Sequence, residues 1–325
     1  MVLSILKGKH PLILILVPLV ALLLFGKALI DPQPLLVHSY HMPLYALLVE
    51  LCGGSQMWLN LVAFVFVVVV AYVLVRLNEE FIFIKQRTDL PALLFVLIVC
   101  GTIPLLGMHP AIPAGLFLVV ALERIFGVYT GSKTISCSFD AGLCIGVASL
   151  FYLGAAPFLL WFLISLIIMG YFRARELMSG LMGFITPFIL VAGWYFWNDK
   201  LPWFGKLLWN NISLPGVVQS LPTAQWVHWG FVGVLALVSI FFMLNVYEEK
   251  RSSSRKYFAI IIWFMVFSVL IYFLIPAFGI EQYLLAAIPL TYITSHFFVL
   301  YRSRWIGEVL FVLLIFMSVI IHFFV

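Results

Sequence analysis

Long apolar runs without polar interruption limit what this chain can fold into. Residues 57–75 contain no alternation of polar and apolar positions, which a closed outer-membrane barrel would need. About 20 apolar residues cross a bilayer as a helix. Only 10% of the 325 residues are charged and 65% are hydrophobic, too little charge to cover a soluble domain. The sequence therefore excludes a soluble enzyme and predicts an all-α, polytopic helical membrane protein.

Ten apolar runs qualify as membrane segments: residues 11–30, 57–78, 90–107, 111–127, 141–170, 177–196, 226–247, 257–276, 281–300 and 305–325. Lys and Arg residues cluster in six of the segments around them: Lys7 and Lys9; Arg76, Lys85 and Arg87; Arg124 and Lys133; Arg173 and Arg175; Lys250, Arg251, Arg255 and Lys256; Arg302 and Arg304. The positive-inside rule places all six in the cytoplasm. Only Lys27, Lys200 and Lys206 then face the other side.

Because the basic segments on both sides of residues 141–170 are placed in the cytoplasm, these residues must leave the cytoplasm and return. The Gly154-Ala155-Ala156-Pro157 sequence supplies a break, because Pro disrupts the helical hydrogen bonds and Gly loosens them. We expect a hairpin with arms of about 13 to 15 residues, too short to cross a full bilayer unaided. The prediction is about 11 membrane helices, with the N-terminus inside and the C-terminus outside.

The organisation along the chain is simple. A polar stretch around residues 248–255 separates a front part, residues 1–247, from a back part of three spans, residues 248–325. The net charge is +5, but in a membrane protein the Lys and Arg residues set the orientation of the spans. The positive charge therefore does not indicate a nucleic-acid partner. The four cysteines show no CxxC spacing and no matching His cluster, which indicates neither a zinc site nor a disulfide framework.

The first outward loop holds the densest group of catalytically capable side chains. Asp31 follows the first span directly, and His38, His41 and Tyr45 come within 15 residues of it. A carboxylate with a tuned pKa acts as a general base, and His or Tyr can position an acceptor or a phosphate. The alternative is that Asp31 meets water or a helix end while the rings lie at the interface. Pro43 starts a predicted interfacial helix of about nine residues, ending at Leu51.

The second long outward segment is rich in Trp and also carries Lys200 and Lys206. An aromatic belt at the headgroup level accounts for most of these Trp residues. Trp203 can alternatively serve as a platform for a sugar or a polyprenyl chain, with the lysines near a lipid phosphate. His109, in a short outward turn, is either a second-site residue or a solvated loop residue. Apart from His296, no ionisable residue is placed at mid-membrane, which disfavours an ion-coupled transporter.

The order of these features resembles the membrane half of the C-type glycosyltransferase superfamily, which uses polyprenyl-phosphate sugars at the outer membrane face. His41-Met42-Pro43-Leu44-Tyr45 is similar to the element that opens the interfacial helix in that superfamily, and Asp31 falls where its catalytic acid lies. Residues 141–150 and 187–197 resemble its short paired helices and the following span. The whole chain also resembles an uncharacterised family of bacterial polytopic envelope proteins, which implies a multi-pass protein of the bacterial inner membrane.

The superfamily resemblance implies sugar transfer from a polyprenyl-phosphate donor to an envelope acceptor. Asp31 would then be the base, His38 and His41 would orient acceptor or phosphate, and Lys200 or Lys206 would stabilise the leaving phosphate. Tyr45 and Trp203 would contact substrate. We expect no cofactor, although some members of that superfamily use a divalent metal ion. Two non-catalytic functions stay open beside it: a scaffold or assembly subunit that binds envelope proteins, and a lipid or polyprenol carrier.

Overall fold

The computed structural model describes residues 8, 11–30, 41–102, 105–129, 131, 133–213, 222–246, 252–275, 277–301 and 303–324. Within these ranges the chain is helical and has no strand. The helices are α2 (Pro11–Ile30), α3 (Pro43–Leu51), α4 (Gln56–Phe81), α5 (Leu90–Cys100), α6 (Ala111–Val128), α7 (Thr134–Phe151), η2 (Leu153–Ala155), α8 (Phe158–Met169), α9 (Ala174–Trp197), α10 (Leu201–Ser213), α11 (Thr223–Asn245), α12 (Ser252–Leu274), α13 (Gln282–Leu300) and α14 (Arg304–Phe324).

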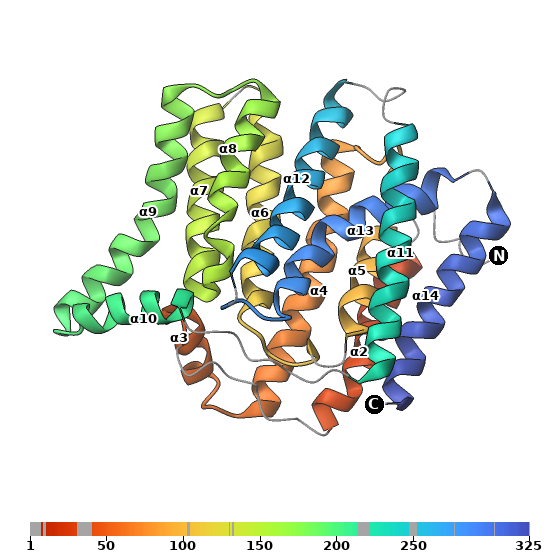
Figure 1. The fold of residues 1–325 in the computed structure, drawn as a ribbon, viewed down its shortest axis with the longest axis horizontal. Coiled ribbons are helices and arrows are strands. Elements are labelled where there is room, and N and C mark those ends of the chain that lie inside the picture. The colour runs from red at the N-terminus through yellow and green to blue at the C-terminus, as the bar shows by residue number, and fades with distance from the viewer. Residues whose placement is uncertain are drawn as a thin grey trace.

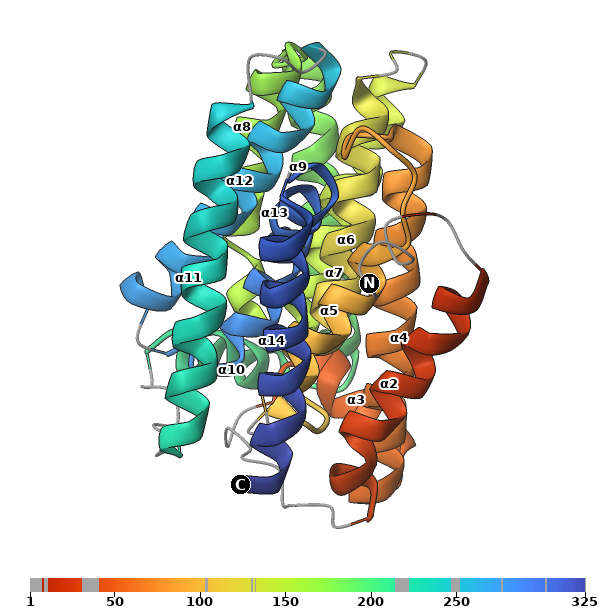
Figure 2. The same ribbon diagram turned by 90° about the vertical axis from the view of Figure 1, so that its right-hand side faces the viewer.

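Most of these helices run side by side between two ends of one bundle (Figures 1 and 2). Nine of the helices in the described ranges are long and apolar enough to cross a membrane, and α5 and the segment Leu153–Met169 are shorter apolar helices. The all-helical membrane architecture expected from the apolar runs is therefore confirmed. Large apolar side chains stay exposed on the outer helices, as on α9 and α11, which is the arrangement expected where lipid is the solvent.

The centre of the bundle is formed by α5 and α13. Every residue of α5 is buried, and α13 runs obliquely through the middle of the bundle, packed against α5, α6, α11 and α12. Buried polar side chains link α13 to α4 and α8 to α12. The Tyr292 hydroxyl donates to the Leu74 carbonyl at 2.8 Å, and the Trp161 indole N–H donates to the Ile260 carbonyl at 3.0 Å. Each bond satisfies a polar group that burial in an apolar bundle would otherwise penalise.

Several expected boundaries are confirmed and two are corrected. The interfacial helix α3 spans Pro43–Leu51, and the 3₁₀ turn η2 with Pro157 breaks the hairpin where Gly and Pro predicted it. The single helix expected over residues 90–107 is wrong, since α5 ends at Cys100. The first hairpin arm is also longer than expected: α7 starts at Thr134, not at residue 141, and has 18 residues.

The longer α7 has a physical explanation. Its first turn looks too polar for a membrane helix, but these polar groups are satisfied by α9. The Thr134 hydroxyl donates to Glu176 at 3.0 Å, and the Ser179 hydroxyl donates to the Ile135 carbonyl at 2.8 Å. The two helices approach closely along Gly142, Gly146 and Gly183, where an added Cβ would lie within 2.5 Å of a backbone carbonyl oxygen of the facing helix.

Those of the expected basic segments that the structure describes lie at the opposite end of the bundle from α3 and α10. The C-terminal ends of α4, α6, α8 and α11 are at the upper end in Figure 1, whereas α3, η2 and α10 are at the lower end. We call these the basic end and the α3 end. At the α3 end, α9 leans away from the bundle, and α10 runs across the direction of the other helices. The Trp-rich sequence of this segment did not predict a helix there.

Candidate functional site

Two of the predicted site residues lie next to each other at the start of α3. The His41 ring is 5.1 Å from the Tyr45 ring, measured between centroids, and Tyr45 is buried. The Tyr45 hydroxyl donates to the Met108 carbonyl at 2.9 Å, which fixes α3 to the connection between α5 and α6. His109, the next residue in that connection, is buried and not solvated. Asp31 and His38 lie outside the described residues.

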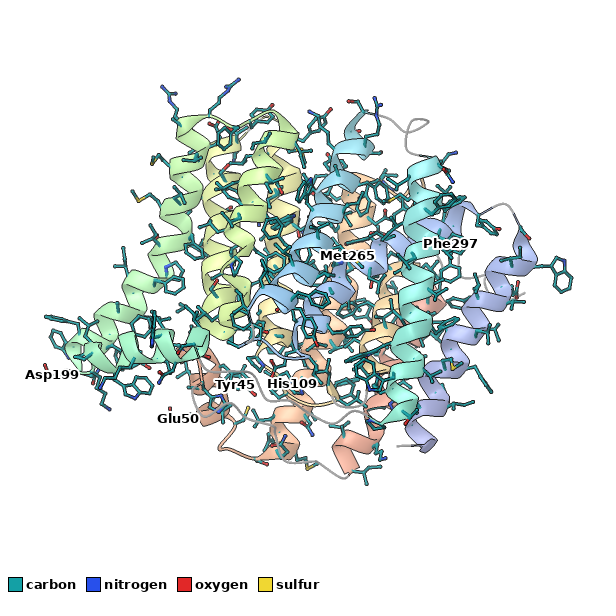
Figure 3. All side chains as sticks on the ribbon, viewed as in Figure 1. Tyr45, Glu50, His109, Asp199, Met265 and Phe297 are labelled. Carbon is teal, nitrogen blue, oxygen red and sulfur yellow. The ribbon has the colours of Figure 1, made fainter. Side chains whose placement is uncertain are left out.

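The start of α10 lies away from Tyr45. Lys200 and Lys206 are exposed, and Asp199, beside Lys200, is at the outer tip of the molecule, well separated from Tyr45 in Figure 3. Trp203 packs against Tyr195 of α9, with ring centroids 5.5 Å apart. Its ring therefore helps to hold α10 against the end of α9.

A carboxylate lies close to the buried phenols instead. Glu281 immediately precedes α13 and is buried. Burial, and secondly the negative charge of Glu281, raise the pKa of Tyr45 and of Tyr152. Because one carboxylate affects both phenols, the start of α3, the end of α7 and the start of α13 converge at this point. Glu281 is the one Asp or Glu side chain buried at the α3 end within the described ranges.

Some buried polar atoms beside Glu281 have no hydrogen-bond partner among the described residues. The Tyr152 hydroxyl and both amide atoms of Gln282 form no hydrogen bond in the part of the chain that the structure describes. A Cβ at Gly154 would lie 3.1 Å from Gln282 Oε1 and 2.4 Å from the Tyr152 ring, so only Gly fits there. Unpaired buried polar groups are rare and costly, and they commonly mark a place for water or a ligand.

An apolar groove begins at Gln282. It has a volume of about 260 Å³ and lies between α11, α12 and α13 at the α3 end. Aromatic side chains form its walls: Trp226, Trp229, Tyr272, Phe273 and Tyr283. Trp229 stacks on Tyr283 with ring centroids 5.3 Å apart, and its indole N–H donates to the Thr102 hydroxyl at 3.2 Å. These contacts fix the aromatic wall in place.

The early end of α5 supports this wall. The last carbonyls of a helix have no partner within the helix. Here the Ser318 hydroxyl donates to the Leu97 carbonyl at 3.1 Å, and the Tyr283 hydroxyl donates to the Ile98 carbonyl at 3.4 Å. The Leu97 carbonyl also accepts the Gly101 N–H at 3.1 Å, so it is the Tyr283 hydroxyl of α13 that replaces, at Ile98, a hydrogen bond that a longer α5 would make. This bond fixes the position of Tyr283 in the groove.

The candidate site thus has two adjoining parts. One is polar and is called here the Glu281 cluster: His41, Tyr45, His109, Tyr152, Glu281 and Gln282. The other is the aromatic groove, and Gln282 belongs to both. The cluster can form hydrogen bonds with hydroxyl or amine groups, and the groove can hold a hydrocarbon chain. Among the described residues no three His, Cys, Asp or Glu side chains are arranged to hold a metal ion.

Comparison with protein families places this site in a wider context. The sequence pattern of the family of unknown function DUF6427 matches residues 37–325. The chain belongs to this family. The DUF6427 match includes the whole Glu281 cluster and all residues of the groove, whereas α2 and Asp31 precede it. No curated protein and no solved structure matches the chain.

Sequence reasoning missed Glu281, Gln282 and Tyr152. Glu281 and Gln282 are adjacent polar residues at the start of an otherwise apolar run, and this position could have marked them. Tyr152 carries no such signal, because a Tyr at the end of an apolar helix usually lies at the membrane interface. Only the packing of η2 against the start of α13 buries its hydroxyl.

Proposed function

We propose that the protein crosses a bacterial inner membrane eleven times, with the basic end in the cytoplasm and the α3 end outside. The nine long apolar helices support this together with the short helices α5 and α8. The separation of the basic connections from α3 and α10 supports the orientation. In this arrangement the N-terminus is inside, the C-terminus is outside, and the Glu281 cluster faces the outer leaflet.

We further propose that the protein binds an amphipathic lipid at the α3 end. The observation that carries this proposal is the position of Gln282, whose unpaired amide joins the polar cluster to the aromatic groove. The groove holds the first part of an isoprenoid or acyl chain, and the remainder lies in the bilayer. Glu281 and Gln282 accept hydrogen bonds from hydroxyl groups of the head. A sugar-bearing polyprenyl phosphate satisfies both requirements.

A cross-linking experiment tests lipid binding. The full chain is placed in nanodiscs with a photoactivatable, mannose-bearing polyprenyl phosphate, and the cross-link yield is measured. Gln282→Leu and Trp229→Ala should lower the yield several-fold, because one removes the polar contact and the other opens the groove wall. Trp305→Ala is the matched control, since Trp305 is 80% exposed on α14. Equal yields for all three variants would refute the lipid site.

Sugar transfer is a second candidate function, favoured by the position of the 41–45 element beside a buried carboxylate. Here Glu281, or Asp31 as the resemblance implies, would accept the proton of the acceptor hydroxyl. Whichever of Glu281→Gln and Asp31→Asn removes this base should abolish transfer of radiolabelled sugar while lipid cross-linking persists. Glu50→Gln, an exposed carboxylate on α3, is the control. Full transfer by both test variants would leave lipid binding or an envelope scaffold as the function.

A further inference from the structure

A second, larger cavity lies at the basic end, remote from the Glu281 cluster. Its volume is about 700 Å³, within the range of small-molecule sites. It is bounded by the end of α4, the connection from α4 to α5, and the adjoining ends of α11, α12 and α13. The residues that give it chemical character are Glu80, Phe81, Lys85, Ser253, Ser254 and His296.

The connection from α4 to α5 is held firmly over this cavity. The buried Asn78 side chain donates to the Gln86 carbonyl at 3.2 Å and accepts the Ile84 N–H at 3.3 Å. Two residues of the connection adopt the left-handed conformation that favours glycine, Ile82 at φ 44° and Lys85 at φ 79°. Such backbone persists only where its surroundings impose it, so the position of Lys85 at the cavity is defined by the fold.

Aromatic packing anchors the same connection. Phe83 is buried among rings of three other helices, with centroids 5.7 Å from Phe126, 5.6 Å from Phe258 and 4.9 Å from Tyr292. Phe258 also contacts the buried His296 ring at 4.9 Å, and His296 lines the cavity. The cavity therefore has a rigid aromatic base, with a rim of charged and hydroxyl side chains.

The charges of the rim are of both signs. Glu80 lies in the last turn of α4, where the helix end is itself partly negative, and Ser253 and Ser254 lie in the first turn of α12, which is partly positive. Lys85 is exposed and forms no ion pair with any described residue. A ligand with one charge would pair either with Glu80 or with Lys85 and the serine hydroxyls, but not with both. A ligand with an ammonium and an acidic group would pair with both.

We propose that this cavity binds a zwitterion in which an ammonium is joined to a phosphate by a short linker. The ammonium lies between Glu80 and the face of Phe81, a favourable position for a cation. The phosphate accepts hydrogen bonds from Lys85 and from the hydroxyls of Ser253 and Ser254. This chemistry is shared by free phosphoethanolamine and by the head group of phosphatidylethanolamine.

Titration of the purified full chain tests this assignment. In nanodiscs of phosphatidylglycerol alone, O-phosphoethanolamine should bind more tightly than inorganic phosphate or ethanolamine. Glu80→Gln and Lys85→Gln should each weaken binding about tenfold, as expected for loss of one charged hydrogen bond. Glu50→Gln and Lys133→Gln, exposed side chains that do not line the cavity, should bind like the unmodified chain.

Adding phosphatidylethanolamine to the nanodiscs distinguishes the two sources. A lipid head group in the cavity would weaken the apparent affinity for the free probe, and native mass spectrometry would show phosphatidylethanolamine retained over phosphatidylglycerol. A free ligand would bind equally in both nanodiscs. The assignment is overturned if inorganic phosphate binds as tightly as the zwitterion, or if Glu80→Gln and Lys85→Gln match their controls. It is also overturned if the free probe does not bind and phosphatidylethanolamine is not retained in preference.

Discussion

Two buried phenols at the α3 end differ in one hydrogen bond. The Tyr45 hydroxyl is paired with the Met108 carbonyl, whereas the Tyr152 hydroxyl has no partner among the described residues. A buried hydroxyl without a partner is penalised by lost hydration, so the same chemical group stabilises the fold at one position and destabilises it at the other. Such an arrangement is retained where a bound molecule supplies the missing partner.

The first prediction compares the two phenols. Tyr45→Phe should lower the free energy of unfolding by about 1 kcal/mol, because it leaves the Met108 carbonyl unpaired. Tyr152→Phe should leave stability unchanged or raise it in lipid-free detergent. Thermal unfolding of both variants in one detergent provides the measurement. A loss of stability in Tyr152→Phe as large as in Tyr45→Phe would show that the Tyr152 hydroxyl has a partner in the apo protein.

The second prediction concerns alkaline pH. The pKa of Tyr152 in the folded chain lies above its ordinary value of about 10. Above pH 10 the unfolded chain loses a proton that the folded chain keeps, so stability falls as pH rises, by about 1.4 kcal/mol per pH unit for this one group. The difference in unfolding temperature between Tyr152→Phe and the unmodified chain should therefore grow from pH 9 to pH 11. The exposed Tyr272→Phe serves as control, and an equal pH dependence in both variants would contradict the prediction.

At the scale of elements, close helix contact depends on glycine. On α9, a Cβ at Gly183 would lie 2.2 Å from the Phe139 carbonyl oxygen of α7, whereas a Cβ at Gly193 would meet nothing within 4 Å. The facing atom at Gly183 is backbone, which cannot rotate away. Small residues let α7 and α9 approach closely, and dispersion contacts then hold the pair together in a solvent as apolar as the side chains.

The third prediction uses these two positions on one helix. Gly183→Ala should destabilise the protein by about 1 to 3 kcal/mol through overpacking. Gly193→Ala should be neutral or stabilise by up to about 1 kcal/mol, because alanine is the better helix former. Thermal unfolding or resistance to SDS denaturation gives the comparison. Equal stability of the two variants would mean that α7 and α9 are not in backbone contact at Gly183.

At the scale of the whole molecule, the two ends of the bundle differ in charge and in shape. Lys85, Arg87, Lys133 and Arg173 lie in short connections at one end of the bundle. The other end carries α3 and α10 with their aromatic rings. Short basic connections are typical of the cytoplasmic face, and interfacial aromatic helices are typical of a headgroup region.

The fourth prediction tests the orientation with single cysteines introduced after the four native ones are replaced. A membrane-impermeant maleimide added outside cells should label Gly205→Cys on α10 and should not label Arg173→Cys until the membrane is opened. Both positions are exposed, and a Cβ at Gly205 meets nothing within 4 Å. Labelling of Arg173→Cys in intact cells would reverse the orientation and move the Glu281 cluster to the cytoplasm.

Of the predicted site residues that the structure describes, only His41 and Tyr45 are shown to be neighbours. They lie four residues apart at the start of α3, so local sequence is enough to place them together. Lys206 and Trp203 lie on α10 and Lys200 immediately precedes it, and the direction of α10 depends on how α9 leans from the bundle. Asp31 and His38 stay predictions. Glu281, Gln282 and Tyr152 come from segments distant in sequence, and local reasoning does not place such residues together.

The sequence alone determined the helical membrane class, most helix limits and the separation of basic from aromatic connections. These follow from local properties: the length of apolar runs, the geometry of Pro and Gly, and the cost of moving charge across lipid. Tertiary structure alone decided that α5 stops at Cys100, that α7 starts at Thr134, and that Glu281 lies beside two phenols. The first two depend on a partner from a remote helix that satisfies a polar group, and the third depends on packing between segments distant in sequence; local sequence records neither.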